Sequence, residues 1–126
     1  MKRLAIALAA ALFAPPAAAQ SHLGSYTAWI GHQDLFNSNG VRLGQAAQIL
    51  RQDRANVHRF GRADQGDSYD PWFADANARA ALEQALMRGG IDRNSAAMIV
   101  QGGVWVQVDV YGWGNQIQAA SASAYR

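Results

Sequence analysis

Cysteine is absent from this 126-residue chain. Without thiols the protein can form no disulfide bond, and both cysteine-containing zinc sites and a lipid-modified N-terminal cysteine are excluded. The three histidines, at positions 22, 32 and 58, lack the spacing of zinc ligands. No segment matches a catalytic or cofactor motif, so we expect a protein without a cofactor whose fold depends on its hydrophobic core.

Lysine is nearly absent as well, because Lys2 is the only one. Lys2 and Arg3 supply the whole formal net charge of +2, and residues 20–126 contain nine arginines and nine acidic residues. A domain that binds nucleic acid usually carries a clear excess of positive charge. We therefore expect no nucleic-acid partner.

Long apolar runs are missing except at the N-terminus. There, Met1-Lys2-Arg3 precedes the apolar run Leu4–Ala14, and Ala17–Ala19 offers an A-x-A site, which is the pattern of a secretory signal peptide cleaved before Gln20. The run is shorter than the about 20 apolar residues that span a bilayer, and Pro15-Pro16 interrupts it. The sequence predicts a periplasmic or secreted protein with no membrane span after cleavage.

The remaining residues 20–126 are long enough for one globular domain, and its small polar tail Ala119–Arg126 is expected to fray. We predict an α+β fold in the order β-α-α-β-β, with two helices packed on one face of a small, mostly antiparallel sheet. The predicted elements are a strand Ser25–Ile30, helices Gln45–Arg59 and Pro71–Arg88, and a hairpin in which Gly102-Gly103 joins Ala97–Gln101 to Val104–Tyr111.

Four charged residues fall inside the apolar arcs of the two predicted helices: Asp53 and Arg54 in the first, and Arg79 and Glu83 in the second. Because isolated buried charges are costly, we expect one interhelical network in which Asp53 pairs with Arg79 and Arg54 with Glu83. Two interpretations stay open. The network can be a structural device that fixes the helix register, or a polar pocket whose arginines hold an anionic partner through paired hydrogen bonds.

His58 lies at the edge of the first predicted helix. A histidine there can act as a general base, but the spacing of the sequence places no nucleophile beside it, and a lone edge histidine is usually a surface or capping group. We keep His58 as a candidate for partner binding rather than for catalysis.

Asp64, Asp67 and Asp70 recur at every third position in a polar loop around Gly66. Their carboxylates suit calcium, but the alternate-residue ligands and the distant glutamate of an EF-hand are missing. Turn and capping chemistry accounts for these aspartates, and we expect no metal site.

The last strongly patterned segment alternates between valines at positions 104, 106, 108 and 110, which should face the core, and polar or aromatic residues that should face outward. Trp105 and Tyr111 are on the outward side. They either form a surface for sugars or peptides, or pack across strands, Trp105 against Trp29.

Together these features predict a small exported protein of the bacterial envelope that acts as a non-catalytic binding or structural accessory domain. Its partner would be an envelope protein, a peptide or a glycan. The alternative is a small envelope enzyme or enzyme inhibitor that uses the polar pocket between the two helices, with Arg54, His58 and Glu83. The candidate binding residues are Asp53, Arg54, His58, Arg79, Glu83, Trp105 and Tyr111.

Overall fold

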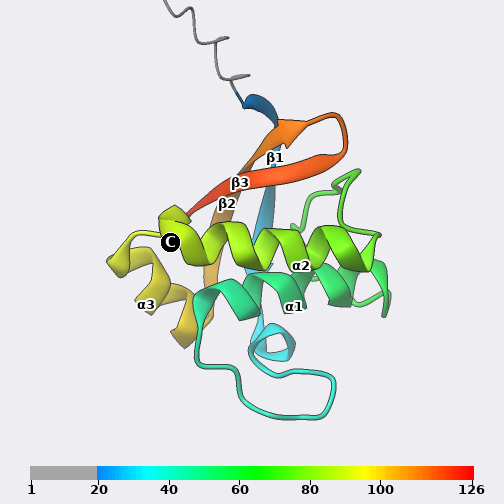
Figure 1. Cartoon of the computed structure of the whole chain (residues 1–126). Coiled ribbons are helices and arrows are strands. Elements are labelled where there is room, and N and C mark those ends of the chain that lie inside the picture. The colour runs from blue at the N-terminus through cyan, green and yellow to red at the C-terminus, as the bar shows by residue number, and fades with distance from the viewer. Residues whose placement is uncertain (1–19) are drawn as a thin grey trace, which may run out of the picture.

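Three helices and a three-stranded antiparallel sheet build the domain (Figure 1), so the predicted α+β class is confirmed. The computed structural model describes residues 20–126, and the predicted signal peptide, residues 1–19, lies outside them. The elements in chain order are β1 Ser21–Ile30, the short 3-10 helix η1 His32–Leu35, α1 Ala46–His58, α2 Ala76–Ala85, the irregular turn η2 Leu86–Gly90, α3 Arg93–Gln101, β2 Val104–Trp113 and β3 Gln116–Tyr125.

The sheet has β2 in the centre, with β1 and β3 antiparallel on its two sides. The predicted alternation in β2 is confirmed, because Val104, Val106, Val108 and Val110 are fully buried while the residues between them are not. The helices therefore cover one face of the sheet only.

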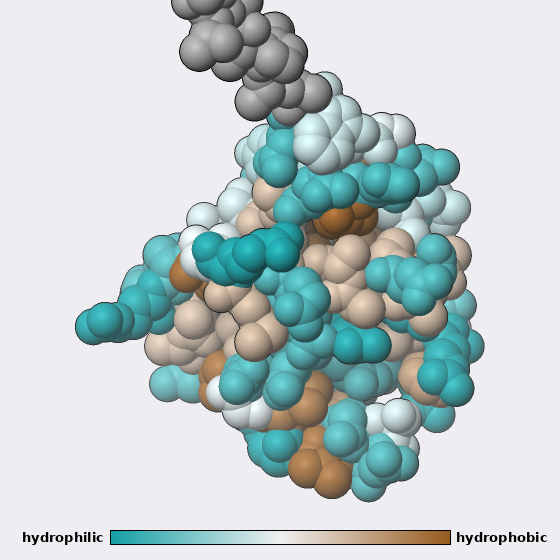
Figure 2. All heavy atoms as spheres, in the orientation of Figure 1, coloured by the Kyte–Doolittle hydropathy of each residue, from teal (hydrophilic) through white to brown (hydrophobic). Residues whose placement is uncertain are grey.

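Helices α1 and α2 run side by side across that face (Figure 1). Ile49 and Leu50 of α1 and Leu82 of α2 are fully buried between the helices and the sheet. Figure 2 shows mostly hydrophilic side chains over the outer side of the two helices. Apolar side chains appear between the β2–β3 hairpin and α2 and over the loop that precedes α1.

The predicted hairpin around Gly102-Gly103 is wrong, because Ala97–Gln101 belongs to α3. Asp92 caps this helix by accepting a hydrogen bond from the amide of Ser95. Gly102 and Gly103 have φ angles of 78° and 67°, which end the helix and turn the chain into β2. The true hairpin joins β2 to β3.

The tail Ala119–Arg126, predicted to fray, instead pairs with β2 as far as Tyr125. Its outer edge is also occupied: Ser95 Oγ accepts from the amide of Ala124, and Arg88 donates to the carbonyl of Gln118. Small residues suit this strand because η2 approaches it closely. A Cβ added at Gly90 would lie 2.1 Å from the carbonyl oxygen of Ala120.

The opposite edge of the sheet is covered by the loop 62–70, which follows α1. Asp67 accepts from the amide of Trp29, and Ser68 exchanges hydrogen bonds with the backbone of Thr27. Within the loop, Asp67 Oδ2 also accepts from the amide of Asp64, which is the turn chemistry that the sequence predicted for the aspartates.

The second helix was predicted to begin at Pro71 but begins at Ala76. Asp70 does act as a cap, accepting from the amides of Trp72 and Phe73, but the turn that it caps is not continued. A second cap follows at Asp75, which accepts from the amide of Asn77 and starts α2.

Candidate functional site

Arg54 is a fully buried cation at the centre of the domain. It donates Nε to Asp53 Oδ2 at 2.7 Å and Nη1 to Asp70 Oδ2 at 2.8 Å. Its guanidinium also lies over the ring of Tyr26, 4.2 Å from the centroid. Arg54 thus ties α1 to the loop 62–70 and to the sheet.

His58 joins the same group, because its Nε2 lies 2.7 Å from Asp70 Oδ2 and its side chain is only 8% exposed. Burial alone would raise the pKa of Asp70. Hydrogen bonds from His58, the Phe73 amide and Arg54 outweigh burial and hold that pKa below its ordinary value. His58 is therefore a partner of a buried carboxylate rather than an edge residue open to solvent.

The predicted pairs between Asp53 and Arg79 and between Arg54 and Glu83 are wrong. Glu83 instead accepts from Arg51 Nη1 at 2.7 Å. Helical phase identified which side chains point inward, but it does not show how far an arginine reaches. Arg54 extends to Asp70, which follows α1 in a loop, and no periodicity in the sequence connects the two positions.

Arg79 has no carboxylate partner among the described residues. It is 7% exposed and donates Nη1 to the carbonyls of Phe73 and Ala74. Burial, together with repulsion from Arg51 and Arg59, lowers the pKa of Arg79.

Arg51, Arg59 and Arg79 line a groove between α1, α2 and the loop before α1, which we call the α1–α2 groove. Its volume is about 340 Å³. Glu83 is the one acidic residue in its lining and is already paired with Arg51. The sequence singled out Arg79 and Glu83 as candidates but not Arg51 and Arg59. Their spacing from Ala55, four residues on either side, was the available signal, since residues four apart share a helix face.

The two aromatic candidates on β2 have separate surroundings. Trp105 lies opposite Trp29 in the sheet register, and their rings meet edge to face with centroids 5.1 Å apart, as the packing interpretation predicted. Gly66 packs directly on Trp105, because a Cβ there would approach the indole ring to 2.3 Å. Tyr111 contacts His22 instead.

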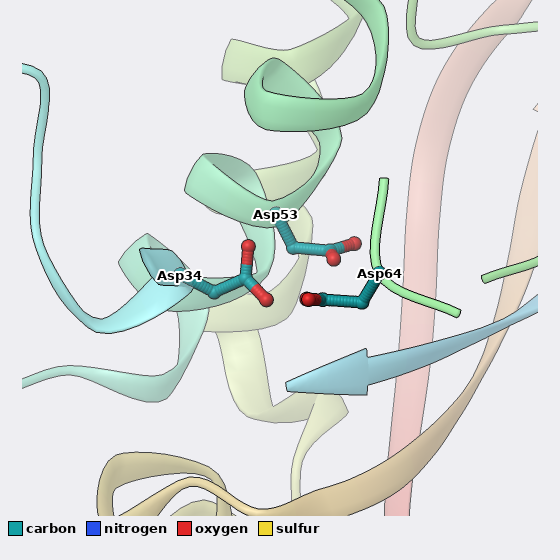
Figure 3. Close-up of side chains that lie close together, drawn as sticks. All are labelled: Asp34, Asp53 and Asp64. Atoms are coloured by element: carbon teal, nitrogen blue, oxygen red, sulfur yellow. The ribbon is translucent and has the colours of Figure 1, made fainter. Parts of the chain in front are cut away.

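A shallow groove is lined by Trp29, Trp105 and the loop residues Asp64–Gly66. Asp64 belongs to a second polar centre together with Asp34 of η1 and Asp53 of α1 (Figure 3). Burial, reinforced by the charge of Asp53, raises the pKa of Asp34 to about 8, and burial only partly offset by Arg54 raises that of Asp53 to about 7.

The structure thus distributes the seven candidates over three places. Asp53, Arg54 and His58 form a buried cluster with Asp70, while Arg79 and Glu83 line the α1–α2 groove. The remaining two, Trp105 and Tyr111, lie on the sheet face away from the helices.

Comparison with models of protein families, with curated proteins and with solved structures found no match to this chain. Among residues 20–126, no helix combines the length and the apolar character that crossing a bilayer requires.

Proposed function

We propose that this protein is an exported binding module of the bacterial envelope, and that the α1–α2 groove holds an anionic group of its partner. The observation that carries the proposal is Arg79, a residue only 7% exposed, whose side chain lines the groove and contacts no carboxylate in the described part of the chain. A buried charge is normally compensated, and an anion in the groove would compensate this one.

The arrangement of donors supports an oxyanion as the ligand. Arg79 uses Nη1 for backbone carbonyls, which leaves Nε and Nη2 for a ligand in the groove. Arg51 and Arg59 add two further guanidinium groups to the same lining. Guanidinium groups bind carboxylates and phosphates through pairs of parallel hydrogen bonds, so the groove suits a carboxylate-bearing or phosphate-bearing envelope component.

The alternative, an enzyme that uses His58, has less support. The ring of His58 is bonded to Asp70, and within residues 20–126 no serine or threonine hydroxyl donates to it. A nucleophile and its base need mutual hydrogen-bond contact, whereas an anion-binding groove needs only donors, which Arg51, Arg59 and Arg79 supply.

Calorimetric titration of the purified protein with inorganic phosphate, at constant ionic strength set with chloride, tests the proposal. We expect saturable binding that weakens about 10-fold or more in Arg51→Gln and in Arg79→Gln, since a hydrogen bond to a charged group contributes about 1.5–3 kcal/mol. Arg79→Lys keeps the charge but not the planar fork, so its affinity for phosphate should lie between those of Arg79→Gln and the unchanged protein.

Arg93→Gln is the matched control, because it removes an exposed arginine at the start of α3, outside the groove lining. It should bind phosphate as the unchanged protein does. Equal binding by Arg79→Gln and the unchanged protein would contradict the proposal.

Export is tested separately by measuring the intact mass of the protein recovered from the envelope. The exported protein should begin at or within two residues of Gln20, and a retained Met1 would contradict export.

A further inference from the structure

We infer that Asp34, Asp53 and Asp64 form a binding site for a hard divalent cation of the size of Ca²⁺. Three elements that are distant in the sequence supply these carboxylates: η1, α1 and the loop 62–70 (Figure 3). One oxygen from each residue lies within 4.8 Å of the other two. The site is separate from the arginine groove, and the inference does not depend on the proposed function.

Unpartnered oxygens in this cluster are the second observation. Asp53 is fully buried, yet its Oδ1 accepts no hydrogen bond from residues 20–126, and the same holds for the buried Oδ2 of Asp64. Asp34 and Asp64 point toward one another, and the Asp53 carboxylate lies beside them (Figure 3). Buried carboxylate oxygens nearly always have a partner, so two orphaned oxygens in one cluster indicate that a ligand is missing between them.

The partners that the cluster does have do not balance its charge. Asp34 accepts from the Gly31 amide and from Asn56, both of which are neutral. The cation in contact with the group is Arg54, which donates to Asp53 Oδ2 and is shared with Asp70. When all three carboxylates are ionised they share part of one positive charge, and a divalent cation would supply the remainder.

Close packing holds the third carboxylate in place. A Cβ added at Gly31 would lie 2.9 Å from Asp64 Oδ2 and 3.0 Å from its Oδ1. Gln33 also donates to Asp64 Oδ1 and to the carbonyl of Arg62, which anchors this end of the loop. The contacts with Gly31 and Gln33 thus direct the carboxylate of Asp64 toward the interior of the cluster.

The donor set favours the larger cation. All three ligands are carboxylate oxygens, which hard cations prefer, and the cluster contains no histidine. The three oxygens lie within 4.8 Å of one another, so one cation can bridge them. Ca²⁺ is favoured over Mg²⁺ because Mg²⁺ dehydrates reluctantly and usually keeps several waters instead of accepting a set of protein ligands.

Terbium luminescence gives a direct test, because Trp29 and Trp105 line the same groove as Asp64 and can sensitise a lanthanide bound there. After removal of metal with EDTA, the purified protein should give saturable Tb³⁺ luminescence that Ca²⁺ displaces and Mg²⁺ at equal concentration does not. Half-saturation by Ca²⁺ at or below about 1 mM is expected, as in extracellular calcium modules. Ca²⁺ should also raise the melting temperature.

Asp64→Asn keeps the shape of the side chain and removes one ligand charge, so it should weaken Ca²⁺ binding at least 10-fold and abolish most of the rise in melting temperature. Asp34→Asn should behave in the same way. Asp75→Asn is the matched control, because asparagine remains a good helix cap at this exposed position outside the cluster, and it should bind Ca²⁺ as the unchanged protein does.

In EDTA Asp64→Asn should be at least as stable as the unchanged protein, since it relieves repulsion between carboxylates and its amide oxygen can still accept from Gln33. Unfolding of this variant in EDTA would mean that shared protons, rather than a cation, hold the cluster together, and would overturn the inference. Absence of saturable Ca²⁺ binding by the unchanged protein, equal binding by Asp64→Asn, or equal displacement by Mg²⁺ would also overturn it.

Discussion

Replacement of Arg54 by methionine should destabilise the domain severely. Its guanidinium is fully buried and is bonded to Asp53 and Asp70. Methionine is long enough to occupy much of the same space, but it leaves both carboxylates without their cation. Removing one partner of a buried ion pair costs about 3–5 kcal/mol, against a total stability of about 5–15 kcal/mol for a typical domain.

A double-mutant cycle separates the ion pair from general damage. Asp70→Asn keeps an oxygen that can accept from the amides of Trp72 and Phe73, so its effect is confined to the Oδ2 position, where it removes the charge and the acceptor that Arg54 and His58 share. We expect the double variant to be more stable than the sum of the two single losses predicts, by about 1–3 kcal/mol. Urea unfolding, with the free energy of unfolding extrapolated to water, measures each value.

The conservative change Arg54→Lys keeps the charge but cannot reach both carboxylates with a planar fork, so its loss should fall between those of the unchanged protein and Arg54→Met. It also provides a measurable folded variant if Arg54→Met is too unstable. A loss within about 0.5 kcal/mol for Arg54→Met, as for surface substitutions, would refute the reasoning. Strict additivity in the cycle would refute it equally.

Two other predictions test particular contacts. The folded pKa of Asp70 is lowered, so its ionised form stabilises the domain above the ordinary carboxyl pKa of about 3.9, and this contribution is lost as the pH falls from there toward the folded pKa. Acid unfolding followed by circular dichroism should therefore show a shallower loss of stability with falling pH for Asp70→Asn than for the unchanged protein. Identical slopes would contradict the lowered pKa of Asp70. Gly90→Ala should lower the free energy of unfolding by about 1–3 kcal/mol because the new methyl group meets the carbonyl of Ala120, whereas Gly44→Ala, with no atom within 4 Å of the added Cβ, should be neutral or slightly stabilising.

The parts of the fold that the sequence predicted are those with strong local patterns. Alternating valines identified β2, and apolar residues at helical spacing identified α1. Strand β3 escaped detection because Gln116–Tyr125 is rich in alanine and serine, which have little strand preference of their own. Its conformation is imposed by pairing with β2 and by the close approach of η2, and neither is visible in a local window.

The candidate site residues were likewise predicted where a local pattern determines their position and missed where tertiary contacts do. Helical phase correctly placed Asp53, Arg54 and Arg79 on buried faces. It gave the wrong partners, because the partners of Arg54 include a loop residue 16 positions away, and loop conformation has no periodicity. Asp34 was not singled out at all, since a single aspartate near a short 3-10 turn resembles an ordinary turn residue until the fold brings Asp53 and Asp64 beside it.

The occupied borders of the sheet determine how this protein can meet other chains. Backbone groups that β1 directs outward at Thr27 and Trp29 are bonded to the loop 62–70, and those of β3 at Gln118 and Ala124 are bonded to Arg88 and Ser95. A free strand edge is a template on which a second polypeptide can add a strand, which is a common route to aggregation. At these positions that route is closed, so a further strand could be added there only by displacing the loop 62–70 or the contacts of Arg88 and Ser95.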